Sequence, residues 1–392
     1  INPGELIVGE RGPRPKATST YPEICTHTLK DLDILNSREK ISFEVDPETR
    51  RAYEKVIIPF WSKRSMREKI FSEMEANWIS AYRSGVFTEF QEQRAPGHTV
   101  LGDKIYSHGF ADFRAKVALN LDQLDIENDS LALDKRETLR AMDVAADALM
   151  IFANRHAQAL KALALKEKDP QRKKELNQME EICGRVPVQS PRTFWEALQY
   201  YWFVHLGVIT ELNPWDSFNP GRLDQNLYPF YRRDIEQGVL TREQARELLQ
   251  AFWIKFNNHP APPKVGVTAQ ESNTYTDFCL INLGGLTKDG SDGVNELTYL
   301  ILEVIGEMRI LQPGSMIQVS KKNPDLLIRK ALDIIKTGFG QPSVFNTDTI
   351  IQELVRQGKS IEDARSGGSS GCVETGAFGV ECYILTGYFN LP

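Results

Sequence analysis

Short apolar runs alternate with amphipathic helices in the last third of the chain, and this alternation constrains the fold more than any other feature. The runs cover residues 278–283, 315–320 and 342–345, a length typical of buried strands. Between the second and third runs, a helix is expected over 325–337, with Asn323 as its N-cap and Pro324 in its first turn. Strands that alternate with helices pair in parallel, so the sequence predicts an α/β layer or barrel.

The first 260 residues have a mainly helical pattern. Apolar residues recur at three- and four-residue spacing over 64–83, 139–168 and 192–208. A further helix is expected near 242–257, where Thr241 and Gln244 have the spacing of a capping box. No internal repeat, low-complexity tract or Pro/Gly-rich linker divides the chain, so we expect these helices to form a layer around the α/β part.

Composition and charge exclude several classes of function. The 392 residues are 41% hydrophobic and carry a net charge of −6, and no Lys/Arg stripe predicts a nucleic-acid partner. No run is long and apolar enough for a membrane span, and no signal peptide is recognisable. The five cysteines are scattered without CxxC spacing, and no paired-histidine motif suggests a metal. We therefore expect a cytoplasmic protein without disulfides or a metal site.

A cysteine and a glutamate two residues apart lie in a glycine-rich segment, 366–376, which follows an expected helix at about 347–365. In extended backbone, Cys372 and Glu374 would point to the same side. The surrounding glycines leave room for a substrate or for another stretch of backbone. The pair suits a reactive sulfur beside a proton carrier, but a small buried cysteine in a flexible loop is an equal alternative.

Two other loops concentrate polar side chains. Arg94 can hold a carboxylate and His98 can move a proton near neutral pH, although a solvated surface turn has the same composition. Asp216 lies between aromatic residues, and it either binds a ligand or forms a structural ion pair with Arg222. Ser272 precedes an expected strand, where capping is the ordinary role of a hydroxyl.

Taken together, these segments resemble the glycyl radical enzymes. The resemblance rests on Gly-Cys-Val-Glu at 371–374, Arg-Ala-Pro-Gly-His at 94–98, and Trp-Asp at 215–216 followed by Pro-Gly-Arg at 220–222. It extends over residues 1–392. The intervals among the candidate residues are most similar to those of the dehydratases that act on trans-4-hydroxy-L-proline.

The resemblance implies a pyruvate formate-lyase-type α/β barrel of ten strands, built from two half-barrels wrapped in helices. Residues 1–392 would form the N-terminal part of this domain, with the helical layer, the first half-barrel and the loop of the thiyl cysteine. The radical glycine of such enzymes lies in an Arg-Val-x-Gly type motif near the C-terminus. This chain contains no such motif, so the glycyl radical domain is expected in a remaining C-terminal part of the protein.

The resemblance also implies a hydro-lyase that removes water from trans-4-hydroxy-L-proline to give a pyrroline carboxylate. Cys372 would form the thiyl radical and Glu374 would be the general base. Asp216 and His98 would assist loss of the 4-hydroxyl group. The implied substrate-binding residues are Phe90 as an apolar wall, Arg94, and Ser272 and Tyr388 at the amino-acid end.

No cofactor is expected to bind this chain directly. The glycyl radical, on a residue outside the chain, would be installed by an activating enzyme that uses S-adenosylmethionine. The implied partners are this radical enzyme, a small-molecule substrate, the remaining C-terminal part and a second copy in a homodimer. Neither nucleic acid nor a membrane is expected.

Two alternatives remain. One keeps the family but changes the reaction to decarboxylation of an arylacetate or carbon–sulfur cleavage of a small sulfonate; a second basic residue near His98 would favour the sulfonate. Residues 312–318, Ala377 and Val380 depart from the dehydratase pattern and bear on this choice. The other alternative is a non-enzymatic helical scaffold or regulatory fragment, favoured if Cys372 is exposed far from the other candidate residues.

Overall fold

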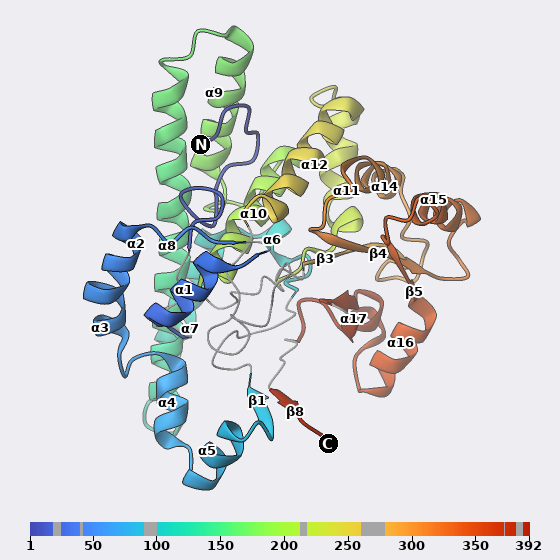
Figure 1. The fold of residues 1–392 in the computed structure, drawn as a ribbon. Coiled ribbons are helices and arrows are strands. Elements are labelled where there is room, and N and C mark those ends of the chain that lie inside the picture. The colour runs from blue at the N-terminus through green and yellow to red at the C-terminus, as the bar shows by residue number, and fades with distance from the viewer. Residues whose placement is uncertain are drawn as a thin grey trace. The chain divides into compact units, whose positions relative to one another are not determined.

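The computed structural model describes residues 1–18, 25–39, 42–89, 100–211, 218–259, 279–371, 373–381 and 387–392 (Figure 1). The chain divides into two compact units. The first, which we call the helical unit, comprises Ile1–Gly9, Asp103–Val204 and Asn226–Phe252. The second, the sheet unit, comprises Glu10–Gly102, His205–Gln225 and Trp253–Pro392.

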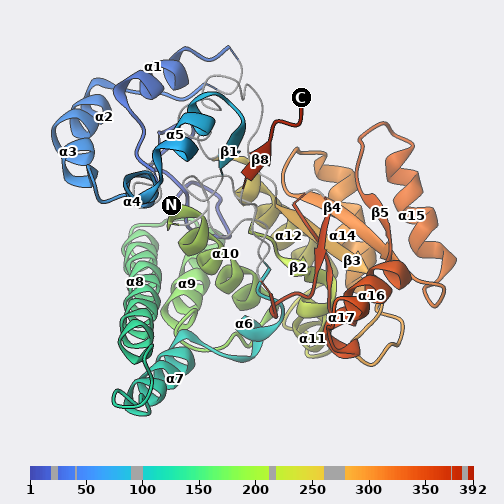
Figure 2. The same cartoon turned by 90° about the horizontal axis from the view of Figure 1, so that it is seen from below.

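The helical unit is built from α6, α7, α8, α9 and parts of α10, α11 and α12. Their bounds are Lys104–Ser107, Phe110–Asp122, Ala132–Ala164, Pro170–Arg185, Phe194–Glu211, Leu223–Glu236 and Arg242–Asn257. α8 and α9 lie side by side (Figures 1 and 2). Apart from Ala132 at its start, the buried residues of α8 recur at three- and four-residue spacing and are mostly alanine: Ala146, Leu149, Ala153, Ala157, Leu160 and Ala164. Such a stripe of small side chains allows two helices to approach closely.

The sheet unit begins with short helices. They are α1 Leu29–Ser37, α2 Pro47–Ala52, the π-helical η1 Tyr53–Ile57, α3 Ile58–Trp61, α4 Met66–Glu73 and α5 Ala76–Arg83. Thr28 starts α1 with a capping box, because its hydroxyl accepts from Asp31 N and the Asp31 carboxylate accepts from Thr28 N. Leu32, Leu35, Phe43 and Tyr53 form a small buried cluster between these elements.

A four-stranded parallel sheet is the centre of the sheet unit. Its strands, in spatial order, are β2 Gly221–Arg222, β3 Leu280–Gly284, β4 Gly314–Val319 and β5 Ser343–Asn346. α14 Glu296–Met308 joins β3 to β4, α15 Asp325–Ile335 joins β4 to β5, and α16 Thr347–Arg356 follows β5 (Figure 2). The predicted strands and their parallel pairing are confirmed, with bounds shifted by one or two residues.

Most predicted helices are confirmed, including the capping box of α12, where Gln244 N donates to Thr241 Oγ1 and Thr241 N donates to Gln244 Oε1. The predicted helix over 64–83 is wrong as one element. Met74 and Glu75 have extended backbone, so α4 ends and α5 begins there.

The predicted helix over 347–365 is also interrupted. Gly358 has a φ of +89°, a conformation that favours glycine and ends α16. Ser360 then caps α17 Ile361–Arg365 by accepting from Asp363 N.

The N-cap prediction for α15 is wrong. Pro324 occupies that position, and the Asn323 side chain instead donates to Gly285 O and accepts from Ser320 N. Asn323 therefore ties the turn after β4 to the turn after β3.

Candidate functional site

The glycine-rich segment around Cys372 folds as a two-stranded antiparallel hairpin. β6 Gly368–Ser370 pairs with β7 Glu374–Gly376, and Ser370 lies opposite Glu374. All of β6 is buried. Between the two strands, Gly371 and Val373 have turn conformation, so the extended backbone expected from Cys372 to Glu374 is not observed at Val373, and the same-side orientation of the two side chains stays a prediction.

Glu374 is the predicted site residue whose side chain the structure describes. It is half-buried, and its Oε2 accepts a hydrogen bond from Val373 N at 3.0 Å. Tyr388 contributes backbone to β8, while its side chain lies outside the described part. The other predicted site residues also lie outside the described residues: Phe90, Arg94, His98, Asp216, Ser272 and Cys372.

Chain segments next to these residues converge on Asn219, which is fully buried. Asn219 forms a parallel bridge with Val100, two residues after His98. Its Oδ1 accepts from Leu280 N at 2.5 Å, and Gly371 N, which immediately precedes Cys372, approaches the same oxygen at 3.5 Å. The ends of three candidate segments and the start of β3 are therefore fixed around one buried amide.

A second pairing joins the segment before Phe90 to the segment of Tyr388. β1 Phe87–Glu89 is antiparallel to β8 Gly387–Phe389, with Thr88 opposite Tyr388. The rings of Phe87 and Phe389 lie 6.2 Å apart, centroid to centroid. The backbone at Tyr388, a predicted substrate-binding position, thus pairs with the strand that precedes Phe90 in the sequence.

Arg222, at the end of β2, links the hairpin to the sheet. Its buried guanidinium donates to four carbonyls: Arg365 O at 2.7 Å, Gly367 O at 3.3 Å, Gly284 O at 2.6 Å and Leu286 O at 2.8 Å. Burial lowers the pKa of Arg222 to about 10. The alternative of an ion pair between Arg222 and Asp216 stays a prediction, because Asp216 lies outside the described residues.

Asp224 connects the end of the sheet to two helices. Its carboxylate accepts from Gly284 N at 2.8 Å and from Thr298 Oγ1, in the first turn of α14, at 2.6 Å. Complete burial raises the pKa of Asp224 to about 6, although these hydrogen bonds favour the charged form. Asp224 thereby holds the strand end that Arg222 also contacts.

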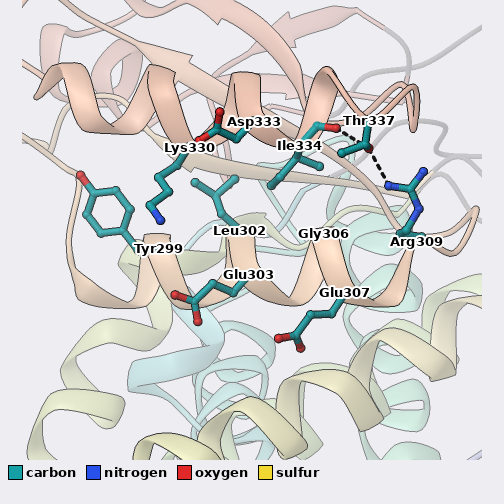
Figure 3. A pocket seen from close by; sticks show the side chains of 10 residues that line it. All are labelled: Tyr299, Leu302, Glu303, Gly306, Glu307, Arg309, Lys330, Asp333, Ile334 and Thr337. Carbon is teal, nitrogen blue, oxygen red and sulfur yellow. Dashed lines mark hydrogen bonds between the residues drawn. The ribbon is translucent and has the colours of Figure 1, made fainter.

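A groove of about 310 Å³ lies between α14 and α15 (Figure 3). Its lining residues are Tyr299, Leu302, Glu303, Gly306, Glu307, Arg309, Lys330, Asp333, Ile334 and Thr337. Side chains of both signs line it, and Arg309 Nη1 donates to Thr337 Oγ1 at 2.6 Å. None of the predicted site residues belongs to this lining, so the groove does not explain the candidate chemistry.

Within the described ranges, no group of three or more His, Cys, Asp or Glu side chains could hold a metal ion. In the same part of the chain, no helix combines the length and the apolar character that a membrane span needs. Cys25, Cys183 and Cys279 are buried, while the other two cysteines lie outside the described residues.

Sequence reasoning missed the buried amides Asn219, Asn282 and Gln318. Asn282 and Gln318 lie inside strands that the sequence predicts to be buried, and they are 0% and 1% exposed. A polar residue in an otherwise apolar strand is the signal that could have found them, because buried polar groups need hydrogen-bond partners.

Comparison with known proteins gives consistent results. The chain is 53% identical to trans-4-hydroxy-L-proline dehydratase of Clostridioides difficile over 392 residues, which are 100% of this chain and 50% of that protein. The crystal structure of that organism's hydroxyproline dehydratase with trans-4-hydroxy-L-proline bound matches 99% of this chain and 49% of its own, with a TM-score of 0.94 and 53% identity.

A more distant relative is isethionate sulfite-lyase of Nitratidesulfovibrio vulgaris, 28% identical over 95% of this chain and 46% of that protein. The chain thus spans about half the length of the curated relatives it matches. The pyruvate formate lyase-like family matches residues 1–392 without interruption. The resemblance drawn from the three motifs is confirmed, and the chain belongs to the pyruvate formate lyase-like family of glycyl radical enzymes.

Proposed function

We propose that the protein to which this chain belongs dehydrates trans-4-hydroxy-L-proline to a pyrroline carboxylate. The observation that supports this most is the 53% identity to a trans-4-hydroxy-L-proline dehydratase along all 392 residues. A relative of another specificity, isethionate sulfite-lyase, is 28% identical. The difference favours a hydroxylated imino acid over a sulfonate, and family membership favours an enzyme over a scaffold.

Cys372 starts the reaction in this proposal. Its thiyl radical takes a hydrogen atom from the ring carbon next to nitrogen, so an S–H bond forms and a C–H bond breaks. The bond strengths are similar, which makes the step reversible. Glu374 then accepts a proton from the neighbouring ring nitrogen as general base. The half-buried position of Glu374, in register with Ser370, is compatible with this role.

Loss of the 4-hydroxyl group comes next. The C–O bond breaks with both electrons on oxygen, and a proton supplied through His98 and Asp216 converts the leaving group to water. Nitrogen and the adjacent carbon form the C=N bond, and the unpaired electron moves to the 4-carbon. That carbon takes the hydrogen atom back from the Cys372 thiol, which regenerates the thiyl radical.

The remaining candidate residues bind substrate in this proposal. Ser272 and Tyr388 hold the amino-acid end, Arg94 supports binding of a carboxylate, and Phe90 forms an apolar wall. The pairing of β1 with β8 supports a common location for Phe90 and Tyr388, because Phe90 directly follows β1 in the sequence and Tyr388 belongs to β8.

Residues 1–392 form, we propose, the N-terminal part of a single barrel domain. A C-terminal part of the protein would complete the barrel and provide the radical glycine, and an S-adenosylmethionine-dependent activating enzyme would install the radical. The matched relatives are about twice the length of this chain, which supports a further part. A homodimer is the expected assembly.

The test is a substrate panel with the full-length protein, activated without oxygen by its activating enzyme. Trans-4-hydroxy-L-proline, an arylacetate and a hydroxyalkyl sulfonate are offered separately, and the cyclic imine product is monitored. We expect turnover of hydroxyproline. Turnover of either alternative without consumption of hydroxyproline would disprove the dehydratase assignment while preserving the family.

Asp216→Asn is the variant for this panel. It keeps the shape of the side chain but removes its charge. Loss of a buried charge-assisted hydrogen bond costs about 2–4 kcal/mol of transition-state stabilisation. We therefore expect hydroxyproline turnover to fall by roughly thirty- to a thousand-fold.

A further inference from the structure

We propose that Asn282 is the positioning residue that fixes the β6–β7 hairpin, and with it Cys372 and Glu374, relative to the parallel sheet. This inference rests on the proposed function, because it assigns Asn282 a role in hydrogen transfer by Cys372. Its geometric basis lies entirely within the sheet unit.

Asn282 binds the backbone of β6 with both ends of its amide. Its Nδ2 donates to Ser369 O at 2.8 Å, and its Oδ1 accepts from Ser369 N at 3.0 Å. Both residues are 0% exposed. This amide therefore gives Ser369 the two hydrogen bonds that a neighbouring strand would otherwise provide.

Gln318, on the adjacent strand β4, orients that amide. Gln318 Nε2 donates to Asn282 Oδ1 at 3.1 Å and to Gly367 O at 3.0 Å. Thr347 Oγ1 donates to Gln318 Oε1 at 3.4 Å. Because Asn282 Oδ1 accepts from two N–H donors, Nδ2 must be the atom that faces Ser369 O.

The hairpin is shaped to receive these amides. A Cβ atom at Gly368 would overlap Asn282 Oδ1 and Gln318 Nε2 and would lie 2.7 Å from Phe378 Cζ. The glycine therefore allows the amides to reach the backbone of β6.

Fixing Ser369 also fixes the residues that come after it. Ser370 pairs with Glu374, and Cys372 lies between them in the sequence. Hydrogen transfer requires the sulfur within contact distance of the substrate carbon, and a misplacement of about 1 Å can lower a rate roughly a hundred-fold. Asn282 contacts neither sulfur nor substrate in this scheme, so it acts through the hairpin.

Gln199 provides a matched control in the helical unit. It is 1% exposed, its Oε1 accepts from Val8 N at 2.8 Å, and its Nε2 donates to Val8 O at 2.9 Å. Gln199→Leu therefore removes the same kind of two-point amide contact with backbone, but from a segment other than the hairpin.

The experiment compares Asn282→Leu with Gln199→Leu in the full-length protein, activated without oxygen, at equal glycyl radical content measured by electron paramagnetic resonance. We expect both variants to lose thermal stability. Only Asn282→Leu should lower kcat, by about 10- to 100-fold, with KM for hydroxyproline changed less than about 2-fold. The kinetic isotope effect with substrate deuterated at the carbon next to nitrogen should also rise in this variant, because hydrogen transfer becomes slower.

Hydrogen exchange gives a readout that does not depend on the substrate. In the protein before activation, amides of the peptide 367–376 should exchange faster in Asn282→Leu than in wild type or Gln199→Leu. Asn282→Ala, which removes the amide without adding apolar bulk, is the milder variant if the leucine protein does not fold. It should show the same changes to a smaller extent.

The two proposals fail in different ways. Wild-type protein that holds the radical but ignores hydroxyproline would overturn the proposed function, while the exchange data would still decide whether Asn282 fixes the hairpin. Wild-type turnover together with equal kcat values in Asn282→Leu and Gln199→Leu would overturn the positioning role. Unchanged exchange over 367–376 in the folded Asn282 variant would overturn it as well.

Discussion

The parallel sheet and the β6–β7 hairpin belong to the same unit, yet different side chains hold them in place. The central strands of the sheet contribute Ile281, Leu283, Met316 and Ile317, which are all 0% exposed. The hairpin strand β6 is equally buried but consists of glycine and serine. Apolar burial therefore accounts for the sheet, whereas the hairpin depends on hydrogen bonds from Arg222, Asn282 and Gln318.

Side chains along β3 and β4 alternate between the two faces of the sheet, which explains how one sheet both packs against the core and holds the hairpin. Asn282 is opposite Met316 and Gly284 is opposite Gln318, so these four residues share one face. Ile281 and Leu283 point to the other face. The face of Ile281 and Leu283 thus supplies apolar packing for the core, while the other face carries the buried Met316 and the two amides that hold the hairpin.

The severest test of this comparison is Cys372→Ser in the activated full-length protein. Turnover should fall below detection while the glycyl radical still forms, because the stronger O–H bond of serine prevents it from relaying a hydrogen atom. Product formation and the radical signal are measured on the same sample. Any turnover above that of the unactivated protein would contradict a thiyl role for Cys372.

Ile317→Ala tests the apolar half of the comparison. Truncating this fully buried side chain should lower the free energy of unfolding by about 2–5 kcal/mol, since it leaves a cavity in the sheet. Activity per folded molecule should stay close to wild type. Leu326→Ala, on the exposed surface of α15, is the control and should change stability by less than about 0.5 kcal/mol. A clear loss of activity per folded molecule would argue against the division between an apolar sheet core and a hydrogen-bonded hairpin.

The pH dependence of unfolding tests Asp224, at the end of the sheet. Its pKa is about 6 in the folded state, against 3.8 for an unperturbed carboxyl, so the folded state binds this proton more tightly. The stabilisation is complete below about pH 4 and is lost as the pH rises through 6, with a span of about 3 kcal/mol. Urea unfolding across this pH window should show the loss of unfolding free energy in wild type and not in Asp224→Asn. Identical pH profiles would contradict it.

Gly368→Ala should give the smallest of these changes. The added methyl overlaps the amides of Asn282 and Gln318, and such overpacking costs about 1–3 kcal/mol of unfolding free energy. Gly184→Ala in α9 is the matched control, because its Cβ meets nothing within 4 Å. That change should stabilise the protein by up to about 1 kcal/mol, as measured by urea unfolding. Equal effects of the two substitutions would show that the hairpin tolerates displacement.

The sequence allowed most of the sheet to be predicted, because each strand is a short apolar run between amphipathic helices. Residues 315–320 and 342–345 became β4 and β5 with small changes in bounds. Helix ends were less predictable. Asn323 is a residue type that is favoured at N-caps, but its side chain donates to Gly285 O. Gly285 is distant in the sequence, so a local sequence pattern cannot predict this contact.

For the site, local sequence indicated Cys372 and Glu374 through their spacing and the surrounding glycines. It did not indicate Asn219, whose amide contacts Leu280 and Gly371 from distant parts of the chain. Both alternatives for Asp216, ligand binding and an ion pair with Arg222, also stay open, because Asp216 lies outside the described residues.

The sequence by itself determined the family and the α/β class and indicated candidate residues for the chemistry, because motifs and hydrophobic periodicity are local properties. Only the tertiary structure decided which side chains fix the hairpin. Asn282 and Ser369 are 87 residues apart in the chain, and their hydrogen bonds exist only when β3 and β6 are packed together. Partners of buried polar groups are chosen by proximity in the folded chain, which no local pattern specifies.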